Sequence, residues 1–187
     1  MKANNQQWEI VKILARGGIG VLPTDTLYGV VGSAFSEKAV ARLYRIRERD
    51  PRKPFIILIG SQSDLKRFGV TVDAPTQNIL SRVWPGKVSV ILPCPLKKFS
   101  YLHRGTGTLA FRLPRSLRIR TFLEKTGPLV APSANLSGMP PAQTLREARK
   151  YFGDRVDFYL GAGKRRSGPA STLIAVQNGK IVVKRKP

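Results

Sequence analysis

The feature that most restricts the fold is the alternation of short apolar runs with segments of helical periodicity. The longest apolar runs, such as residues 55–59, have the length of a β-strand and are far too short to cross a bilayer. Between such runs, apolar residues recur at helical spacing; Val40, Leu43 and Ile46, for example, share one stripe of the segment 37–49. The alternation predicts an α/β protein. Strands are predicted at 19–23, 55–59, 88–92, 109–113, 129–131, 172–176 and 180–184, and helices at 8–15, 37–49, 75–83, 116–125 and 144–152.

The last two predicted strands are separated by a turn signal. The pair Asn178-Gly179 favours a tight β-hairpin, so at least part of the sheet is expected to be antiparallel. Two other segments, 93–106 and 162–170, are rich in glycine and basic residues. We expect these two segments to be mobile loops.

Length and the amino-terminal residues predict the organisation and location of the chain. With 187 residues, 42% of them hydrophobic, the segment 1–187 is expected to form one domain. The first ten residues are polar where a signal peptide needs an apolar run, and the single cysteine, Cys94, suits a reducing compartment. We therefore expect a cytoplasmic protein without a membrane span, in which Cys94 has a structural role.

The charge balance predicts the kind of partner. Lysine and arginine number 33 against 11 aspartate and glutamate residues, which gives a formal net charge of +22. Such a surface attracts anions, and nucleotide phosphates, an RNA backbone and an acidic membrane face are all candidates. Charge alone does not choose among them.

Familiar motifs for nucleotides, metals and catalytic triads do not fit. The segment 161–164 resembles a P-loop faintly, but Phe158 stands at its first glycine position and Arg165 at its Ser/Thr position. The pair of glycines in 18–20 lacks the third glycine of a dinucleotide fingerprint. The only histidine, His103, lies in a basic loop and is expected to be solvated. No spacing of acids, cysteines or histidines predicts a structural metal.

Four polar segments remain, each at the end of a predicted strand or helix, where side chains can face a common cleft. Each also has a plainer interpretation: a capped turn, a solvated helix end, the exposed face of a strand and an ordinary loop. Arg112 is the most informative residue, because an unpaired charge buried in a strand would be costly. It is therefore either exposed or bound to an anion. The four segments are 23–29, 45–54, 108–114 and 131–138.

Taken in order, these segments carry a resemblance that covers residues 17–185. The series PTDTLYG, RER with KPF, WPGKVSVILP, TLAFRLP, APSANLSG and SGPAST resembles the threonylcarbamoyl-AMP synthase (YrdC-like) family. The resemblance implies a single twisted mixed sheet flanked by helices, with a large basic concave cleft. It implies a nucleotidyltransferase that converts L-threonine, bicarbonate and ATP, with accompanying Mg²⁺, into threonylcarbamoyl-adenylate and pyrophosphate. A transferase complex would use the product for threonylcarbamoyladenosine modification of tRNA, and direct contact with tRNA or double-stranded RNA is a further expectation.

The resemblance also assigns residues. Arg47 and Arg49 are expected to be catalytic; the threonine-binding set is Thr26, Arg112, Ser133 and Ser171, and the ATP-binding set is Arg47, Arg49, Lys53, Thr108, Asn135 and Arg185. The chain departs from the family pattern at several positions. Arg47 stands where lysine is usual, and its planar fork binds oxygens in pairs, which a lysine does not. The other departures are Lys53 for asparagine, Leu58 for a histidine of some members, Gln143 for threonine and Ala170 for an acidic residue.

Two alternatives stay open from the sequence. The substitution at Arg47 is compatible with a paralogue that kept the fold but uses another substrate. The net charge and the basic clusters at 97–98, 164–166 and 184–186 are compatible with a nonenzymatic RNA-binding module.

Overall fold

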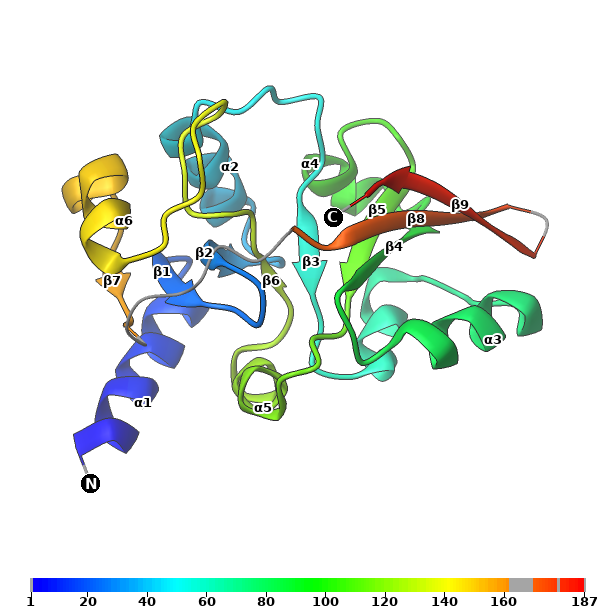
Figure 1. Cartoon of the computed structure of the whole chain (residues 1–187), viewed down its shortest axis with the longest axis horizontal. Coiled ribbons are helices and arrows are strands. Elements are labelled where there is room, and N and C mark those ends of the chain that lie inside the picture. Colours follow the sequence, from blue (N-terminus) through cyan, green and yellow to red (C-terminus); the bar gives the residue numbers. More distant parts are fainter. Residues whose placement is uncertain (1, 162–169, 178, 187) are drawn as a thin grey trace.

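The strands form one mixed sheet in the computed structural model, which describes residues 2–161, 170–177 and 179–186. The order is β7-β1-β2-β6-β3-β5-β4-β8-β9 (Figure 1). The pairs β1/β7, β3/β5 and β4/β8 are parallel, and the other neighbours are antiparallel. The predicted mixed α/β sheet is thus confirmed. The strands are β1 Ile19–Pro23, β2 Tyr28–Ser33, β3 Ile56–Leu58, β4 Val88–Pro93, β5 Thr108–Arg112, β6 Leu129–Val130, β7 Phe158–Tyr159, β8 Thr172–Gln177 and β9 Lys180–Arg185.

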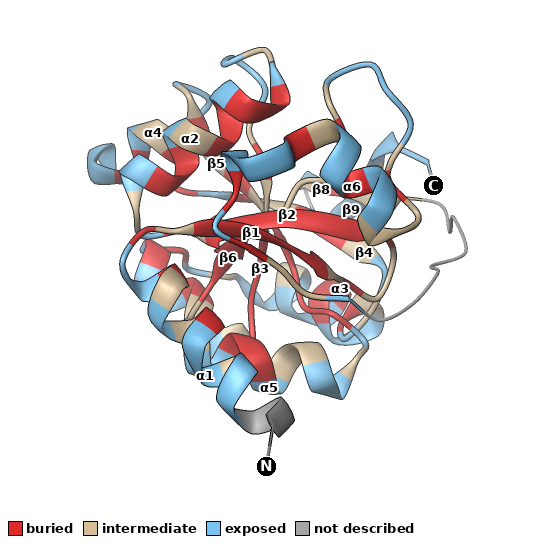
Figure 2. Cartoon of the chain, turned by 90° about the vertical axis from the view of Figure 1, so that its left-hand side faces the viewer, coloured by how far each residue is buried: buried red, intermediate tan, exposed pale blue. Residues whose placement is uncertain are grey.

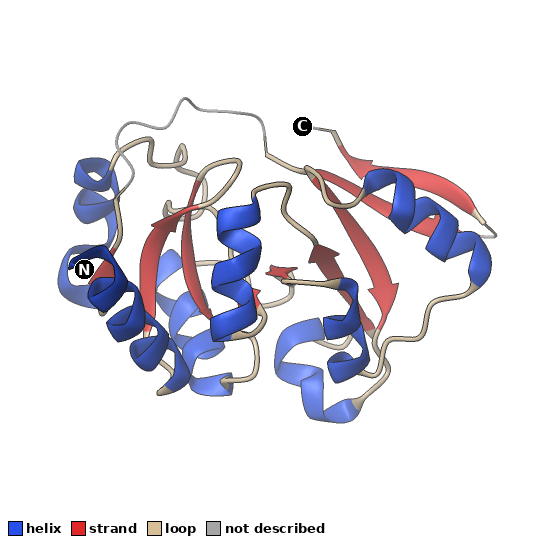
Figure 3. Cartoon of the chain, turned by 90° about the horizontal axis from the view of Figure 1, so that it is seen from below, coloured by secondary structure: helices blue, strands red, loops and turns tan. Residues whose placement is uncertain are grey.

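Helices cover both faces of the sheet (Figures 2 and 3). α1 and α5 lie on one face, and α2 and α4 lie on the other (Figure 2). The helices are α1 Lys2–Ala15, α2 Glu37–Arg47, α3 Ala74–Val83, α4 Ser100–His103, α5 Leu117–Thr126 and α6 Leu145–Phe152, with 3₁₀ turns at Gln62–Phe68, Lys97–Phe99 and Gly153–Arg155. None of the helices in the described ranges is long and apolar enough to cross a membrane.

Two apolar clusters correspond to the two faces. The smaller one joins Ile10 and Leu14 of α1 to Phe122 and Leu123 of α5 across β1, β2 and β3. The larger one includes the buried stripe of α2, with Val40 fully inside it. Since burial of apolar surface supplies most of the driving force for folding, these two clusters fix the helices on the sheet. The polar loops at the strand ends are left to form a site.

Helix α2 shows how local sequence places one wall of that site. Ser36 caps its start, because the Ser36 Oγ accepts a hydrogen bond from the amide of Ala39 at 3.2 Å. The helix ends at Arg47, two residues earlier than predicted, because Glu48 takes a left-handed conformation with φ of 52°. The chain therefore turns away after Arg47, and that side chain is buried at the helix end.

Several predictions made from the sequence were wrong in detail. β2 was not predicted, because its first residues, Tyr28 and Gly29, belong to a segment that we interpreted as a turn. β7 is only two residues long and gives no periodic signal. The segment 93–106, predicted as a mobile loop, contains a 3₁₀ turn and α4, and it buries Phe99 and Leu102. Apolar contacts with the core hold this segment in place.

The prediction of a solvated His103 was also wrong. Its side chain is buried, and Nδ1 accepts a hydrogen bond from the amide of Gly105 at 3.2 Å. Cys94 is buried as well, and its thiol donates to the carbonyl of Phe68 at 3.3 Å. The strands flanking the predicted hairpin pair as expected, with Gln177 opposite Lys180, whereas Asn178 lies outside the described residues. The same holds for 162–169 of the second predicted loop.

Candidate functional site

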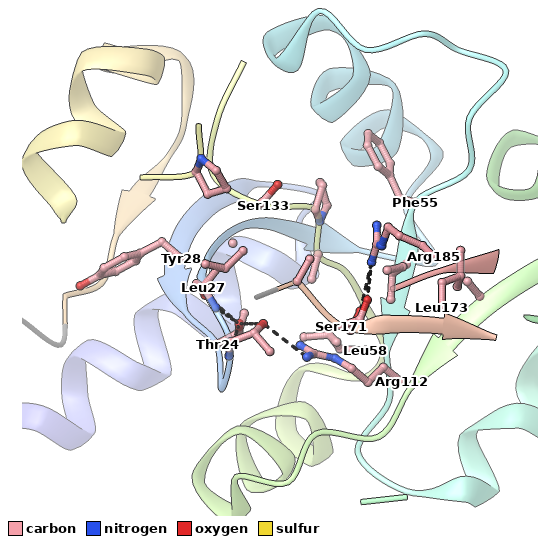
Figure 4. A pocket seen from close by; sticks show the side chains of 18 of the residues that line it. Thr24, Leu27, Tyr28, Phe55, Leu58, Arg112, Ser133, Ser171, Leu173 and Arg185 are labelled. Atoms are coloured by element: carbon pink, nitrogen blue, oxygen red, sulfur yellow. Dashed lines mark hydrogen bonds between the residues drawn. The ribbon is translucent and has the colours of Figure 1, made fainter. Parts of the chain in front are cut away.

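The polar segments meet at a cavity of about 230 Å³ near the middle of the sheet (Figure 4). The sheet order explains this meeting, because β2, β6, β3 and β5 are consecutive neighbours. Gly29 and Ser133 form an antiparallel bridge, which brings the first and last of the four segments together. Of the predicted site residues, the cavity is lined by Thr26, Arg47, Arg49, Arg112, Ser133, Ser171 and Arg185.

At one end of the cavity, Arg112 forms an ion pair with an acid. Its Nη2 lies 3.0 Å from Oδ1 of Asp25, and both side chains are more than nine-tenths buried. Its Nη1 donates to the hydroxyl of Thr26 at 3.3 Å. The second oxygen of Asp25 accepts from the amide of Arg115 at 3.1 Å. Arg112 is thus buried and paired with Asp25. The sequence left open whether this arginine is exposed or bound to an anion, and its anionic partner is Asp25.

The turn that carries Thr26 is fixed by Thr24. The Thr24 hydroxyl donates to the carbonyl of Leu27 at 2.7 Å and accepts from the amides of Thr26 and Leu27 at 3.2 Å. It also lies 3.1 Å from the Thr26 hydroxyl. Threonine side chains that bond to their own turn in this way stabilise it. The Thr26 hydroxyl is thereby held within hydrogen-bonding distance of Arg112.

At the other end of the cavity, Arg47 is buried and contacts neutral oxygens. Its Nε donates to the carbonyl of Asn135 at 3.0 Å, and its Nη2 donates to Oδ1 of Asn135 at 3.1 Å. Ser133 Oγ lies 3.5 Å from the same Nη2. No ion pair joins Arg47 to an acid within the described ranges. The positive charge of Arg47 is therefore solvated by dipoles alone.

Asn135 organises the loop after β6 and does not line the cavity. Its Oδ1 accepts from Arg47 and from the Ser133 hydroxyl, the latter at 2.6 Å. Its Nδ2 donates to the carbonyls of Leu136 and Met139, both at 2.7 Å. These bonds use both polar atoms of the amide. The geometry makes Asn135 the support that holds Arg47 and Ser133 in place.

Arg49 and Phe55 form another part of the cavity wall. The guanidinium of Arg49 lies 5.3 Å from the ring centre of Phe55, and its Nε donates to the carbonyl of Lys53 at 3.3 Å. Arg47 approaches the same ring at 5.9 Å. Cation–π contacts at these distances hold the planar groups without neutralising them. Lys53 itself is exposed and does not line the cavity.

The third wall comes from β8 and β9. Ser171, just before β8, is buried, and its hydroxyl lies 2.9 Å from that of Ser89 on β4. Arg185 Nη2 donates to the Ser171 carbonyl at 2.7 Å and contacts its hydroxyl at 3.3 Å, as Figure 4 shows. Thr108 does not line the cavity, although it lies on the same strand face as Ala110 and Arg112.

Burial of several positive charges is the dominant electrostatic feature, and repulsion between them adds to it. Burial, and secondarily the charge of Arg49, lowers the pKa of Arg47 to about 10. Burial also lowers the pKa of Arg112, where Asp25 acts in the opposite direction, and the pKa of Arg185, where Arg49 adds to the effect. A pKa of about 10 still leaves Arg47 protonated at neutral pH. Four positive charges thus surround a cavity whose described lining contains no carboxylate, which favours a ligand with several negative charges.

Two residues that contact the site were not assigned any role from the sequence. Asp25 lies in the first polar segment, but nothing in the sequence shows that it pairs with Arg112, 87 positions further along the chain. Ser89 interrupts the apolar strand 88–92, and a small polar residue at such a buried position is a signal that could have indicated it. No group of three or more potential metal ligands occurs within the described ranges.

Comparisons with known proteins give the site a context. Residues 12–186 match the Sua5/YciO/YrdC family model, which is described as telomere recombination. The threonylcarbamoyl-AMP synthase of Shigella boydii is 32% identical over 164 residues, which cover 86% of each chain. Two solved structures share the fold. Pyrococcus abyssi Sua5 complexed with L-threonine has a TM-score of 0.83 and 27% identity over 96% of this chain, and Escherichia coli YciO has a TM-score of 0.85 and 24% identity over 97%.

These matches differ in how much of the relative they cover. The chain spans 54% of the P. abyssi Sua5 chain but 89% of the E. coli YciO chain. The family model covers nearly the whole sequence, including every residue that lines the cavity. The polar segments that the sequence singled out are the ones that the structure gathers around the arginines. By the extent of this match, the chain belongs to the Sua5/YciO/YrdC family.

Proposed function

We propose that this protein is a threonylcarbamoyl-AMP synthase. The observation that carries the proposal is the group of four arginines, Arg47, Arg49, Arg112 and Arg185, which line one cavity together with the hydroxyl side chains of Thr26, Ser133 and Ser171. Such a lining suits an amino acid at one end and a polyphosphate at the other. The S. boydii relative bears this activity in its name, and P. abyssi Sua5 was crystallised with L-threonine.

The end of the cavity with Arg112 suits the amino acid. Arg112 is fixed by Asp25 and Thr26, so the rest of its guanidinium can receive a carboxylate in a constant direction. The hydroxyls of Ser133 and Ser171 also line the cavity and can bond the amine, the side-chain hydroxyl or a nascent carbamate. A cavity of about 230 Å³ suits an amino acid with an attached group better than a complete nucleotide.

The nucleotide would extend beyond the cavity. Arg47, Arg49 and Arg185 would bind the phosphates. Lys53 and Thr108, which do not line the cavity, would bind the rest of ATP outside it. Because the described lining has no carboxylate, Mg²⁺ would arrive bound to the phosphates of ATP, and the chain would hold the complex through its phosphate oxygens. Asn135 would act on ATP through Arg47, which it positions.

The proposed reaction has two steps. The amine nitrogen of threonine bonds to the carbon of carbon dioxide, supplied by bicarbonate with loss of water, and a proton leaves the nitrogen. An oxygen of the resulting carbamate then bonds to the α-phosphorus of ATP while the bond from that phosphorus to pyrophosphate breaks. Arginines fixed in advance stabilise the charge that develops on phosphate oxygens, and the enclosed cavity keeps the reactants together. No covalent intermediate with the protein is required.

Two alternatives remain from the sequence. A paralogue with another substrate is supported by Arg47, whose guanidinium is hydrogen-bonded to Asn135 and lies 3.5 Å from the Ser133 hydroxyl. A nonenzymatic RNA-binding module is supported by the net charge of +22. Binding of tRNA by the enzyme itself, delivery of the product to a tRNA-modifying transferase complex and a cytoplasmic location also remain parts of the proposal.

The decisive experiment measures pyrophosphate release from ATP, bicarbonate and Mg²⁺, with L-threonine, serine or glycine or without an amino acid. The synthase predicts release that depends on threonine and yields threonylcarbamoyl-adenylate. Release that depends on another amino acid would favour the paralogue. A folded protein that releases no pyrophosphate, and whose affinity for RNA falls steeply with salt, would favour the RNA-binding module.

A further inference from the structure

A second cavity lies behind the turn that carries Thr26. Its volume is about 710 Å³, which is within the range of small-molecule sites. It is larger than the cavity lined by the four arginines, which we call the arginine cavity. Its walls come from the first half of α1, the end of β1, the start of α5 and Leu160. Helices α1 and α5 lie next to each other on the same face of the sheet (Figures 1 and 2). Thr24 lines both cavities, so one turn of the chain separates them.

The floor of this second cavity is apolar. Leu22 and Phe122 are buried there, and Ile119 and Leu160 pack partly exposed against the same cluster. Ligand sites commonly combine such a floor with a few polar groups that fix orientation. An apolar body would be favoured here by removal of its surface and that of the floor from water, at about 25 cal/mol per Å².

The rim of the cavity is cationic. Lys87, Arg115 and Arg118 come from three positions around the cavity, just before β4, just before α5 and in the first turn of α5. None of the three forms an ion pair within the ranges that the structure describes. Ser116 provides no side-chain cap for α5, so the positive end of the helix dipole adds to the same potential.

The one acid in the lining does not cancel this potential. Asp25 is already compensated by Arg112, whose Nη2 lies at 3.0 Å, and by the amide of Arg115. The side chain of Asp25 is only 7% exposed, so little of its charge is accessible from the cavity that it lines. The balance of accessible charge in the rim is therefore positive.

We infer that the second cavity binds a small anion that carries an apolar body, at a site separate from the arginine cavity. The anionic group would lie among Lys87, Arg115 and Arg118, and the apolar body would lie on Phe122, Ile119 and Leu160. An inorganic anion alone would leave the apolar floor of the cavity exposed to water, and a neutral apolar molecule would leave the three cations without an anionic partner. This inference does not depend on the proposed synthase activity.

The test uses the full chain and the fluorescent anion 8-anilinonaphthalene-1-sulfonate, which combines a sulfonate with an aromatic body. Titration is expected to give saturable fluorescence at one site. The double variant R115Q/R118Q should weaken binding at least tenfold, whereas the matched control R82Q/R146Q, with the same loss of charge on exposed residues that do not line the cavity, should change it less than twofold. Ser116→Tyr keeps every charge and fills the cavity, so it should also weaken binding at least tenfold.

Four results would overturn the inference. One is the absence of saturable fluorescence, and another is an equal loss in the two double variants, which would show attraction to net charge alone. The third is unchanged binding by Ser116→Tyr, and the fourth is full displacement by pyrophosphate with L-threonine; either would place the probe elsewhere. Circular dichroism and thermal unfolding of each variant separate loss of the site from loss of the fold. Because the assay measures binding without turnover, its result is independent of whether pyrophosphate release succeeds.

Discussion

The two ends of the arginine cavity stabilise a buried positive charge in different ways. Arg112 meets a buried carboxylate, Asp25, at 3.0 Å, so its charge is compensated within the protein. Arg47 meets only the carbonyl and amide oxygens of Asn135, with the Ser133 hydroxyl at 3.5 Å. The first charge is balanced within the protein, although the Nε of Arg112 has no hydrogen-bond partner among the described residues, and the second charge is not balanced.

This difference suggests different tasks for the two ends. A compensated arginine keeps one orientation and can select the shape of a ligand, here the carboxylate of threonine in the proposed function. An arginine without a counter-charge favours any group that supplies one, here a phosphate. The lowered pKa of Arg47, about 10, shows how unfavourable its charge is in the free protein, and an anion beside it would raise that pKa again.

The largest expected effect comes from removal of Arg112, the arginine whose charge is compensated by Asp25. Arg112→Met leaves Asp25 buried without its partner, and we expect a loss of about 3–5 kcal/mol in the free energy of unfolding. Urea denaturation measures this loss. The double variant D25N/R112M should regain most of the stability, because the unpaired charge is gone, but should not regain threonine-dependent pyrophosphate release. A double variant as unstable as the single one would contradict the pairing.

The next largest effect tests, through ligand binding, whether Arg47 lacks a counter-charge in the free protein. Pyrophosphate should stabilise the protein through the uncompensated end, by about 2.7 kcal/mol at a concentration one hundred times its Kd. Thermal unfolding with and without pyrophosphate measures this. Arg47→Met should abolish most of the protection, while the exposed control Arg82→Met should keep it. Equal protection of both variants would show that pyrophosphate binds elsewhere.

The fold class and the assignment of both arginines to one site were accessible from the sequence. The α/β architecture, most strand positions and the polar segments followed from apolar periodicity and turn residues, which are local properties. The resemblance then assigned Arg47 and Arg112 to one site. The different environments of the two arginines could not be predicted, because they depend on contacts between residues far apart in the chain. Asp25 and Arg112, for example, become neighbours only when the turn after β1 meets the end of β5.

The errors have the same origin. His103 looked solvated because its neighbours in the sequence are basic and glycine-rich, but α4 packs the histidine against the core. Thr108 and Asn135 match the family motif and Lys53 departs from it; none of the three lines the cavity, and their role in ATP binding stays a prediction. A motif match fixes where a residue lies along the chain, whereas its exposure and direction are properties of the packed structure.

A smaller effect tests the uncompensated end directly. Arg47→Met removes a charge that no acid balances, and Asn135 keeps the hydrogen bond from the Ser133 hydroxyl at 2.6 Å. Loss of the bonds from Arg47 is thus partly offset by relief of its desolvation, and we expect a change of only about 1 kcal/mol in unfolding free energy. Threonine-dependent pyrophosphate release should nevertheless fall about 100-fold. A loss of stability as large as that of Arg112→Met would remove the distinction between the two ends.

The smallest expected effect concerns a residue behind the third wall. The Ser89 hydroxyl lies 2.9 Å from that of Ser171 and does not line the cavity. Ser89→Ala deletes one hydrogen bond, worth about 1 kcal/mol, and leaves the Ser171 hydroxyl with Arg185, at 3.3 Å, as its remaining partner among the described residues. If Ser171 binds threonine, the KM for threonine should rise about fivefold at an unchanged KM for ATP, and Ser89→Thr, which retains a hydroxyl, should restore part of it. An equal rise in both constants would mean that Ser89 supports the fold of β4 and β8 in general, because a displaced strand would move Arg185 together with Ser171.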